Sequence, residues 1–248
     1  MNTIKLSSEN KPLMIAHRGC SGLERENTAA AFVAAGNRSY WGIETDVHKT
    51  LDGKYVIFHD NTTLRLADED LEVERTSFDT LRALKLKNKY TDEKDRADLV
   101  IPTLSEYIAI CKHYEKIAVL ELKNEFTESE IGEICDIIAD LDYLNNTTFI
   151  SFCYQNLVYL RRKYPAQPAQ FLLGSSKKPN NGIPENWLEM LLAGPFDLDI
   201  MHSALTPEIA NACHQNGIKI NTWTVNTPED AARVIELGVD QITTNILE

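Results

Sequence analysis

Two histidines and two carboxylates near the amino terminus could form an acid–base pair beside a metal site. His17 and His59 each follow a short apolar segment, and Glu44 and Asp46 lie two apart in a strand-like segment between them. Side chains two apart on a strand point to the same face, so both carboxylates can reach one pocket. Imidazoles transfer protons in both directions near neutral pH, and carboxylate oxygens bind hard divalent cations. The pattern predicts His17 and His59 as catalytic groups and Glu44 and Asp46 as metal ligands.

A predicted hairpin brings the second histidine back to the carboxylates. Asp52-Gly53 separates residues 43–47 from residues 54–58, and Asp-Gly is a strong signal for a tight hairpin turn. The second run then lies beside the first and ends at His59.

Glu121 is predicted as a third metal ligand, two positions before Lys123 on an apolar strand over residues 116–123. One strand carboxylate is usually a structural ion pair, but three crowded carboxylates repel one another unless a cation neutralises them. Ligation by oxygen alone favours Mg²⁺ or Ca²⁺ over zinc.

Apolar strands and helical segments alternate along the rest of the chain, which predicts parallel β/α units. Thr103 with Glu106, and Thr127 with Glu130, predict capping boxes, and Asn27 or Thr28 could cap the first helix. Eight strands in alternation favour an α/β fold of the TIM-type (β/α)8 barrel class, with a doubly wound open sheet as the alternative. The eight strands are expected over residues 12–16, 43–47, 116–123, 148–152, 170–173, 198–201, 219–225 and 241–244, and the hairpin adds a further strand over residues 54–58.

Two irregularities interrupt this pattern. Residues 61–100 are highly charged and separate one strand from its helix, so they are predicted to be an insertion that caps the site. The insertion belongs to a single predicted barrel domain of residues 1–248. The sequence ends a few residues after the last predicted strand, which leaves no residues for an eighth helix. The amino-terminal segment or a partner subunit, in a homodimer, is expected to cover that gap.

Composition narrows the class of protein. The formal net charge of −12 argues against binding to nucleic acid or to an anionic membrane surface. The amino-terminal residues lack the apolar core of a signal peptide, and no segment approaches the roughly 18 to 20 apolar residues of a membrane helix. The five cysteines are scattered and show no C-x-x-C spacing. Reduced thiols in a cytoplasmic protein fit this pattern.

The sequence resembles the glycerophosphodiester phosphodiesterase family. The resemblance rests on segments that follow the family's order along almost the whole chain. The sequence departs from the family pattern at two places: Arg25 stands where the family commonly has Pro, and Asn245-Ile246-Leu247 stands where it commonly has Asp-x-Pro. These segments are HRG at 17–19, ENT at 26–28, ETDVHKTLDGKYVIFHD at 44–60, IPTL at 101–104, LELK at 120–123, WTVN at 223–226 and GVDQITT at 238–244. The family is a barrel, which supports the closed fold.

The resemblance implies metal-dependent hydrolysis of small-molecule glycerophosphodiesters to sn-glycerol 3-phosphate and an alcohol. Arg18 suits bidentate contact with phosphate oxygens, with a salt bridge to Glu26 or another carboxylate as the alternative, and Lys123 offers a point charge. Phe152 and Trp223 are predicted to wall the substrate channel, and core packing is the alternative for both. Structural or surface roles are expected for His48, His113, His202 and His214, with His202 the best candidate for an exception because it follows a strand.

Three other functions use parts of the same pattern. A lysophospholipase D or a phosphoinositide-type phospholipase would use the same histidine pair, but the acidic composition argues against a lipid surface. A catalytically silent, ligand-binding barrel would have no need of all five predicted catalytic and metal groups. A sugar-phosphate isomerase would have no use for three metal carboxylates.

Overall fold

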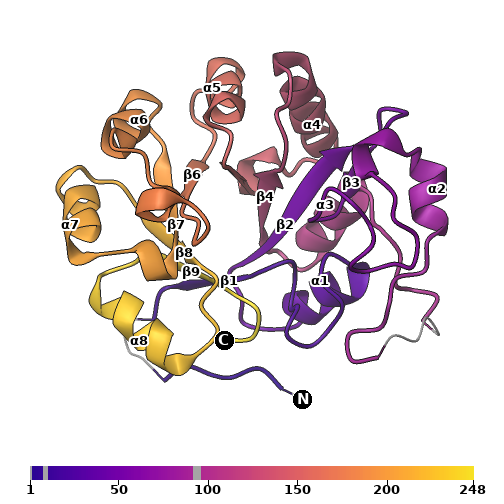
Figure 1. The fold of residues 1–248 in the computed structure, drawn as a ribbon, viewed down its shortest axis with the longest axis horizontal. Helices are drawn as coiled ribbons and strands as arrows, with labels where there is room; N and C mark the ends of the chain where they lie inside the picture. Colours follow the sequence, from indigo (N-terminus) through magenta and orange to yellow (C-terminus); the bar gives the residue numbers. More distant parts are fainter. Residues whose placement is uncertain (1, 8–10, 92–95) are drawn as a thin grey trace.

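Eight parallel strands close into a barrel in the computed structural model, which describes residues 2–7, 11–91 and 96–248. The strand β1 pairs in parallel with both β2 and β9, so the sheet has no open edge between them (Figure 1). This closure confirms the predicted (β/α)8 barrel and excludes the doubly wound sheet. The barrel strands are β1 Leu13–Ala16, β2 Gly42–Lys49, β4 Ile117–Leu122, β5 Thr147–Ser151, β6 Ala169–Leu173, β7 Asp197–Met201, β8 Ile220–Trp223 and β9 Gln241–Thr244.

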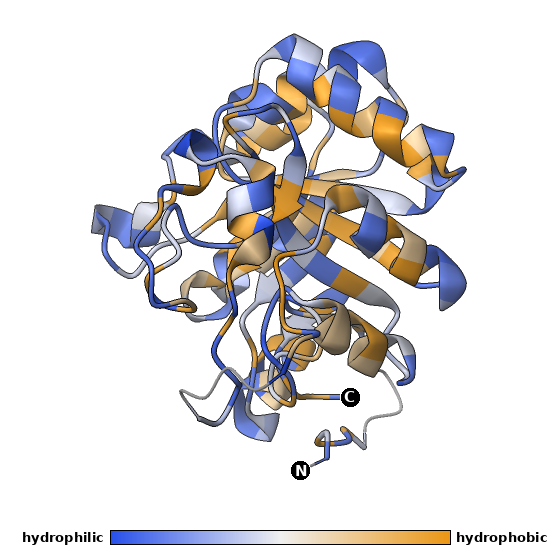
Figure 2. Ribbon diagram, turned by 90° about the vertical axis from the view of Figure 1, so that its right-hand side faces the viewer, coloured by the Kyte–Doolittle hydropathy of each residue, from blue (hydrophilic) through white to orange (hydrophobic). Residues whose placement is uncertain are grey.

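Amphipathic helices surround the barrel and turn their apolar sides toward it, as the hydropathy colouring in Figure 2 shows. Both predicted capping boxes are present, at Thr103 and Thr127, and Thr28 rather than Asn27 caps α1. The surrounding helices are α1 Ala29–Gly36, α3 Leu104–His113, α4 Glu128–Asp140, α5 Tyr154–Lys163, α6 Trp187–Ala193, α7 Pro207–Gln215 and α8 Pro228–Glu236.

The predicted hairpin and insertion lie between β2 and α3. β3 (Tyr55–Ile57) runs antiparallel to β2, and the short helices η1 (Val73–Arg75) and α2 (Phe78–Ala83) follow it. The insertion has an apolar cluster of its own, which includes Leu66 and Leu81. It packs against the loop after β1, where Arg96 pairs with Glu24 at 2.6 Å.

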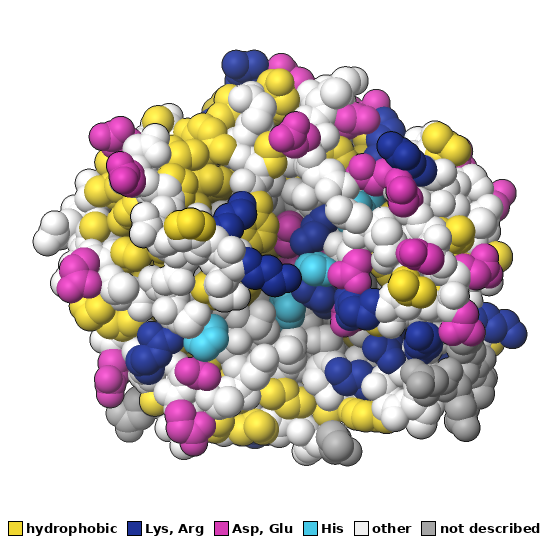
Figure 3. All heavy atoms as spheres, in the orientation of Figure 1, with side chains coloured by type: hydrophobic (Ala, Val, Ile, Leu, Met, Phe, Trp, Pro, Cys, Tyr) yellow, Lys and Arg dark blue, Asp and Glu magenta, His cyan; other side chains and the backbone are white. Residues whose placement is uncertain are grey.

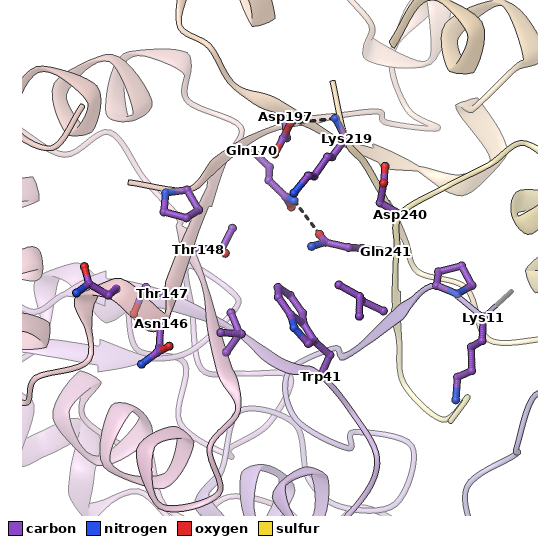
Figure 4. A pocket seen from close by; sticks show the side chains of 15 residues that line it. Lys11, Trp41, Asn146, Thr147, Thr148, Gln170, Asp197, Lys219, Asp240 and Gln241 are labelled. Carbon is purple, nitrogen blue, oxygen red and sulfur yellow. Dashed lines mark hydrogen bonds between the residues drawn. The ribbon is translucent and has the colours of Figure 1, made fainter. Parts of the chain in front are cut away.

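The inside of the barrel is divided between apolar and polar side chains. Ile15, Val119, Ile150 and Leu172 form a small apolar cluster. On β6 to β9 the buried residues include Gln170, Asp199, Asn221, Gln241 and Thr243. A cavity of about 430 Å³ opens at the amino-terminal end of the strands (Figure 4), where the Gln170 amide donates to Gln241 Oε1 at 2.8 Å.

The described residues form no helix after β9. The amino-terminal segment instead runs beside the carboxyl-terminal tail: the Ile4 amide donates to the Ile246 carbonyl at 3.0 Å, and the Glu248 amide donates to the Ile4 carbonyl at 2.7 Å. This arrangement agrees with one of the two expected covers, while a partner subunit remains a prediction. Across the described residues, none of the helices has the length and apolar character needed to cross a membrane.

Candidate active site

The predicted site residues come together at the carboxyl ends of the barrel strands. Figure 3 shows a hollow near the middle of this face, where basic, acidic and histidine side chains gather. A cavity of about 90 Å³ is present there. Its lining includes every residue predicted for the site except Asp46, namely His17, Arg18, Glu44, His59, Glu121, Lys123, Phe152 and Trp223.

Asp46 lies with Glu44 and Glu121 in a buried carboxylate cluster. One oxygen from each residue lies within 4.8 Å of the others. The cluster forms because Asp46 on β2 is in register with Glu121 on the adjacent parallel strand β4, and Glu44 lies two residues before Asp46. Asp46 Oδ1 is buried and has no hydrogen-bond partner among the described residues. Three oxygen donors, one of them buried without a hydrogen bond, suit a hard divalent cation.

The charges in this cluster oppose one another. Burial first, and the charge of Asp46 second, raise the pKa of Glu44 well above its ordinary value. The same two causes raise the pKa of Glu121 to about 7. Burial also opposes ionisation of Asp46, but the positive charges of Arg18 and then Lys123 hold its pKa below the usual range. A bound cation would offset the repulsion that raises the pKa of the two glutamates.

Arg18 and Lys123 place positive charge beside the carboxylates. Arg18 donates to Glu26 at 2.7 Å, which is the salt bridge considered as its alternative role, and its Nε lies 3.7 Å from Asp46. Arg18 Nε is buried without a hydrogen-bond partner in the described part of the chain. Lys123 Nζ lies 2.9 Å from Glu121 and 3.5 Å from Asp46. Both cations are thus held by carboxylates while they line the cavity.

Each of the two histidines is oriented through its Nδ1 atom. His17 Nδ1 lies 2.7 Å from Asn245 Oδ1, and His59 Nδ1 lies 2.6 Å from Asp60 Oδ1. An amide oxygen only accepts, so the proton of a neutral His17 is on Nδ1 and its Nε2 is free to accept. Burial lowers the pKa of His17 to about 4, and the charge of Arg18 adds to this effect. Burial also lowers the pKa of His59, while the charge of Asp46 opposes this.

Several contacts of the site were not predicted from the sequence. Asn245 orients His17, and Asn27 Nδ2 donates to Asp46 Oδ2 at 2.8 Å. Arg65 from the insertion pairs with Glu26 at 2.7 Å and with Asp60 at 2.6 Å. The sequence spacing could have predicted that Asn245 faces the site. Gln241, Thr243 and Asn245 lie two residues apart along the last strand, and Gln241 and Thr243 line the inside of the barrel.

The insertion contacts the site through Arg65, which pairs with Glu26 and Asp60. None of the described residues of 61–100 is among those that line the cavity. That the segment caps the site stays a prediction.

Phe152 and Trp223 form an aromatic wall of the cavity. Their ring centroids lie 5.7 Å apart in an edge-to-face arrangement. Phe152 is 47% exposed, which argues against the alternative that it packs in the core. Among the described lining residues there is no His48, His113, His202 or His214.

The comparisons with known proteins agree on one family. Residues 17–248 match the model of the glycerophosphoryl diester phosphodiesterase family. The chain is 29% identical over 241 residues to a glycerophosphodiester phosphodiesterase of Caldanaerobacter subterraneus, covering 95% of this chain and 94% of the other. A phosphodiesterase of Oleispira antarctica, solved in complex with the product sn-glycerol 3-phosphate, superposes with a TM-score of 0.78 at 27% identity, covering 95% of this chain and 93% of that one. A Silicibacter pomeroyi structure at 23% identity shares the fold, with a TM-score of 0.84 over 97% of this chain and 92% of the other.

Proposed function

This chain belongs to the glycerophosphoryl diester phosphodiesterase family, and we propose that it hydrolyses glycerophosphodiesters to sn-glycerol 3-phosphate and an alcohol with the groups described above. The observation that carries the proposal is a cluster of three buried carboxylates within 4.8 Å of one another, beside two histidines that line the same cavity. The product bound to the Oleispira antarctica relative supports the same reaction.

Glu44, Asp46 and Glu121 would hold the divalent cation, and their oxygen-only donor set favours Mg²⁺ or Ca²⁺. When bound, such an ion supplies positive charge that lowers the pKa of a nearby hydroxyl and stabilises negative charge in the transition state.

The hydrogen-bond partners of the histidines support a division of their roles. His17 is held by a neutral amide and has a low pKa, so it is unprotonated and suited to act as the base. It removes the proton of the glycerol 2-hydroxyl as that oxygen attacks phosphorus. Burial lowers the pKa of His59, and its hydrogen bond to the Asp60 carboxylate favours the protonated form against that effect. His59 donates its proton to the alcohol oxygen as the bond from phosphorus to that oxygen breaks.

The first step leaves a cyclic glycerol phosphate, and water opens it in the second step. His59, now unprotonated, takes a proton from the attacking water, and His17 returns its proton to the 2-hydroxyl oxygen. Arg18 and Lys123 hold the non-bridging oxygens, which keeps the attacking and leaving oxygens in line. The proton balance of the two histidines is restored after each turnover.

Two further expectations remain proposals. We propose a cytoplasmic location, which the five free cysteines support, since four of them are buried and none forms a disulfide in the described residues. A homodimer is the second of these proposals.

The test begins with metal-stripped protein and glycerophosphocholine, with and without added Mg²⁺ or Ca²⁺. The readout is sn-glycerol 3-phosphate, and a parallel assay uses micelles of a lysophospholipid. His17→Ala should abolish metal-dependent release, whereas His113→Ala, an exposed histidine on α3, serves as the matched control. Release from the lipid alone would favour the phospholipase alternative. No release from either substrate would favour the catalytically silent barrel.

A further inference from the structure

All four buried side-chain polar atoms without a hydrogen-bond partner in the described chain belong to residues at this one site: Arg18, Asp46, Asp199 and Trp223. The roles proposed above for Arg18 and Asp46 give their atoms phosphate and cation partners. Asp199 Oδ1 and Trp223 Nε1 have no role in the reaction as described so far. A buried polar atom without a partner costs free energy, so such atoms in a cavity wall indicate a bound group.

Asp199 and Trp223 are diagonal neighbours on the inner face of adjacent strands. Asp199 on β7 is in register with Asn221 on β8, and Trp223 lies two residues beyond Asn221 on the same side. This spacing is within reach of a large side chain. In the circular strand order, β7 is four strands from β2 in both directions. The pair therefore lies across the barrel from Glu44 and Asp46.

Asn221 interacts with the Asp199 carboxyl group, but no described residue forms a hydrogen bond with Asp199 Oδ1. Asn221 Nδ2 lies 3.0 Å from Thr243 Oγ1, and the Gln170 amide donates to Gln241. Asp199 is only 1% exposed and lines the cavity. Burial first, and the charge of Glu121 second, raise its pKa well above the ordinary value. Because burial disfavours charge at this position, a hydrogen-bonding partner at Asp199 Oδ1 would lower the cost of burying that atom.

The chemistry of the pair is complementary to a hydroxyl group. A hydroxyl donates one hydrogen bond and accepts others, whereas the indole N–H only donates and a carboxyl oxygen accepts. The cavity of about 90 Å³ has room for a short polyol fragment. The edge-to-face rings of Phe152 and Trp223 offer an apolar wall for its carbons.

We propose that Asp199 and Trp223 bind the terminal hydroxyl of the substrate's glycerol moiety and so select glycerol over diols that lack this group. This inference rests on the proposed function. The glycerol would span the cavity, with its phosphate and attacking hydroxyl on the side of β2 and β4 and its terminal hydroxyl on the side of β7 and β8.

The experiment compares glycerophosphocholine with an analogue in which propane-1,2-diol replaces glycerol, so that only the terminal hydroxyl is lost. The ratio of the two kcat/KM values is the readout. Two hydrogen bonds of ordinary strength predict a ratio of about 10 to 100 for the wild type. Asp199→Leu should reduce the ratio to below about threefold, mainly through loss of activity on the glycerol substrate, by the same reasoning. Trp223→Phe, which keeps a ring but removes the N–H, should reduce it partially.

Leu172→Met is the matched control, because Leu172 lines the same cavity without a polar group. It should keep the wild-type ratio, and thermal unfolding of each variant shows that it is folded. A wild-type ratio in both Asp199→Leu and Trp223→Phe would overturn the proposal.

A second pair of substrates identifies which half of the diester is bound. Glycerophosphoglycerol and glycerophosphopropanol differ only in hydroxyls of the departing alcohol. If Asp199→Leu changes this second ratio instead of the first, the pair binds the departing alcohol and the proposal is wrong. Inactivity of the wild type on all four diesters would overturn the proposed function itself.

Discussion

Replacing Glu121 by Gln distinguishes a metal ligand from a structural ion pair. Glu121 lies 2.9 Å from Lys123, so its carboxylate could simply stabilise the fold. If it is instead held in the cluster for a cation, its charge is unfavourable in the metal-free protein. The two roles predict opposite changes in the free energy of unfolding of the metal-free variant.

The magnitude follows from the raised pKa of Glu121. A carboxyl group with a pKa of 4.5 in the unfolded chain and about 7 in the folded protein stabilises the fold only while it is protonated. That stability is fully present below pH 4.5 and is lost as the pH rises through about 7. Gln mimics the protonated form at every pH. Metal-free Glu121→Gln should therefore be more stable than the wild type by roughly 3 kcal/mol at pH 8 and by about 1 kcal/mol at pH 5.

The assay is urea unfolding of chelator-treated protein at both pH values. Glu185→Gln, an exposed residue before α6, makes the same change in net charge and is the matched control. Added Mg²⁺ or Ca²⁺ should stabilise the wild type by mass action and stabilise Glu121→Gln much less. The reasoning fails if the metal-free variant is less stable than the wild type by a similar amount at pH 5 and pH 8, because that is the behaviour of a lost ion pair.

Three more predictions concern the residues around the cluster. His17→Ala and His59→Ala should each lower turnover by about 10² to 10⁴-fold if these residues transfer protons, and near-normal turnover in either variant would remove that residue from the mechanism. Asn245→Ala should lower kcat by about 10-fold or more, because it frees the His17 ring to adopt the wrong tautomer, and should leave the midpoint of thermal unfolding unchanged. Asn245→Asp should restore the hydrogen bond and raise the pH at which kcat is half-maximal. Arg18→Lys should raise KM by about 10-fold and affect kcat less, because a lysine cannot reproduce a bidentate contact with phosphate. An unchanged KM would leave Arg18 with only its salt bridge to Glu26.

Local patterns in the sequence were sufficient for the elements and for the groups that carry the chemistry. A strand places every second side chain on one face, which is why the pairs Glu44 with Asp46 and Glu121 with Lys123 could be read as members of one site. The turn at Asp52-Gly53 and the capping boxes depend on neighbouring residues only, and the structure contains them as expected.

The contacts that tune those groups depend on closure of the barrel. Asn245 lies beside His17 only because β9 returns to pair with β1, although 228 positions separate the two residues. Asp199 faces the site across the barrel for the same reason. The contact of the insertion with the site, through Arg65 with Glu26 and Asp60, likewise joins residues that local spacing does not bring together.

The sequence alone therefore determined the residue types, the elements that carry them and the class of chemistry. Only the tertiary structure decided which partner holds each histidine, which carboxyl groups have a raised pKa and which buried atoms are left without a partner. The reason is physical: burial and the distances between charges set hydrogen bonding and pKa values, and both arise only when distant strands pack together.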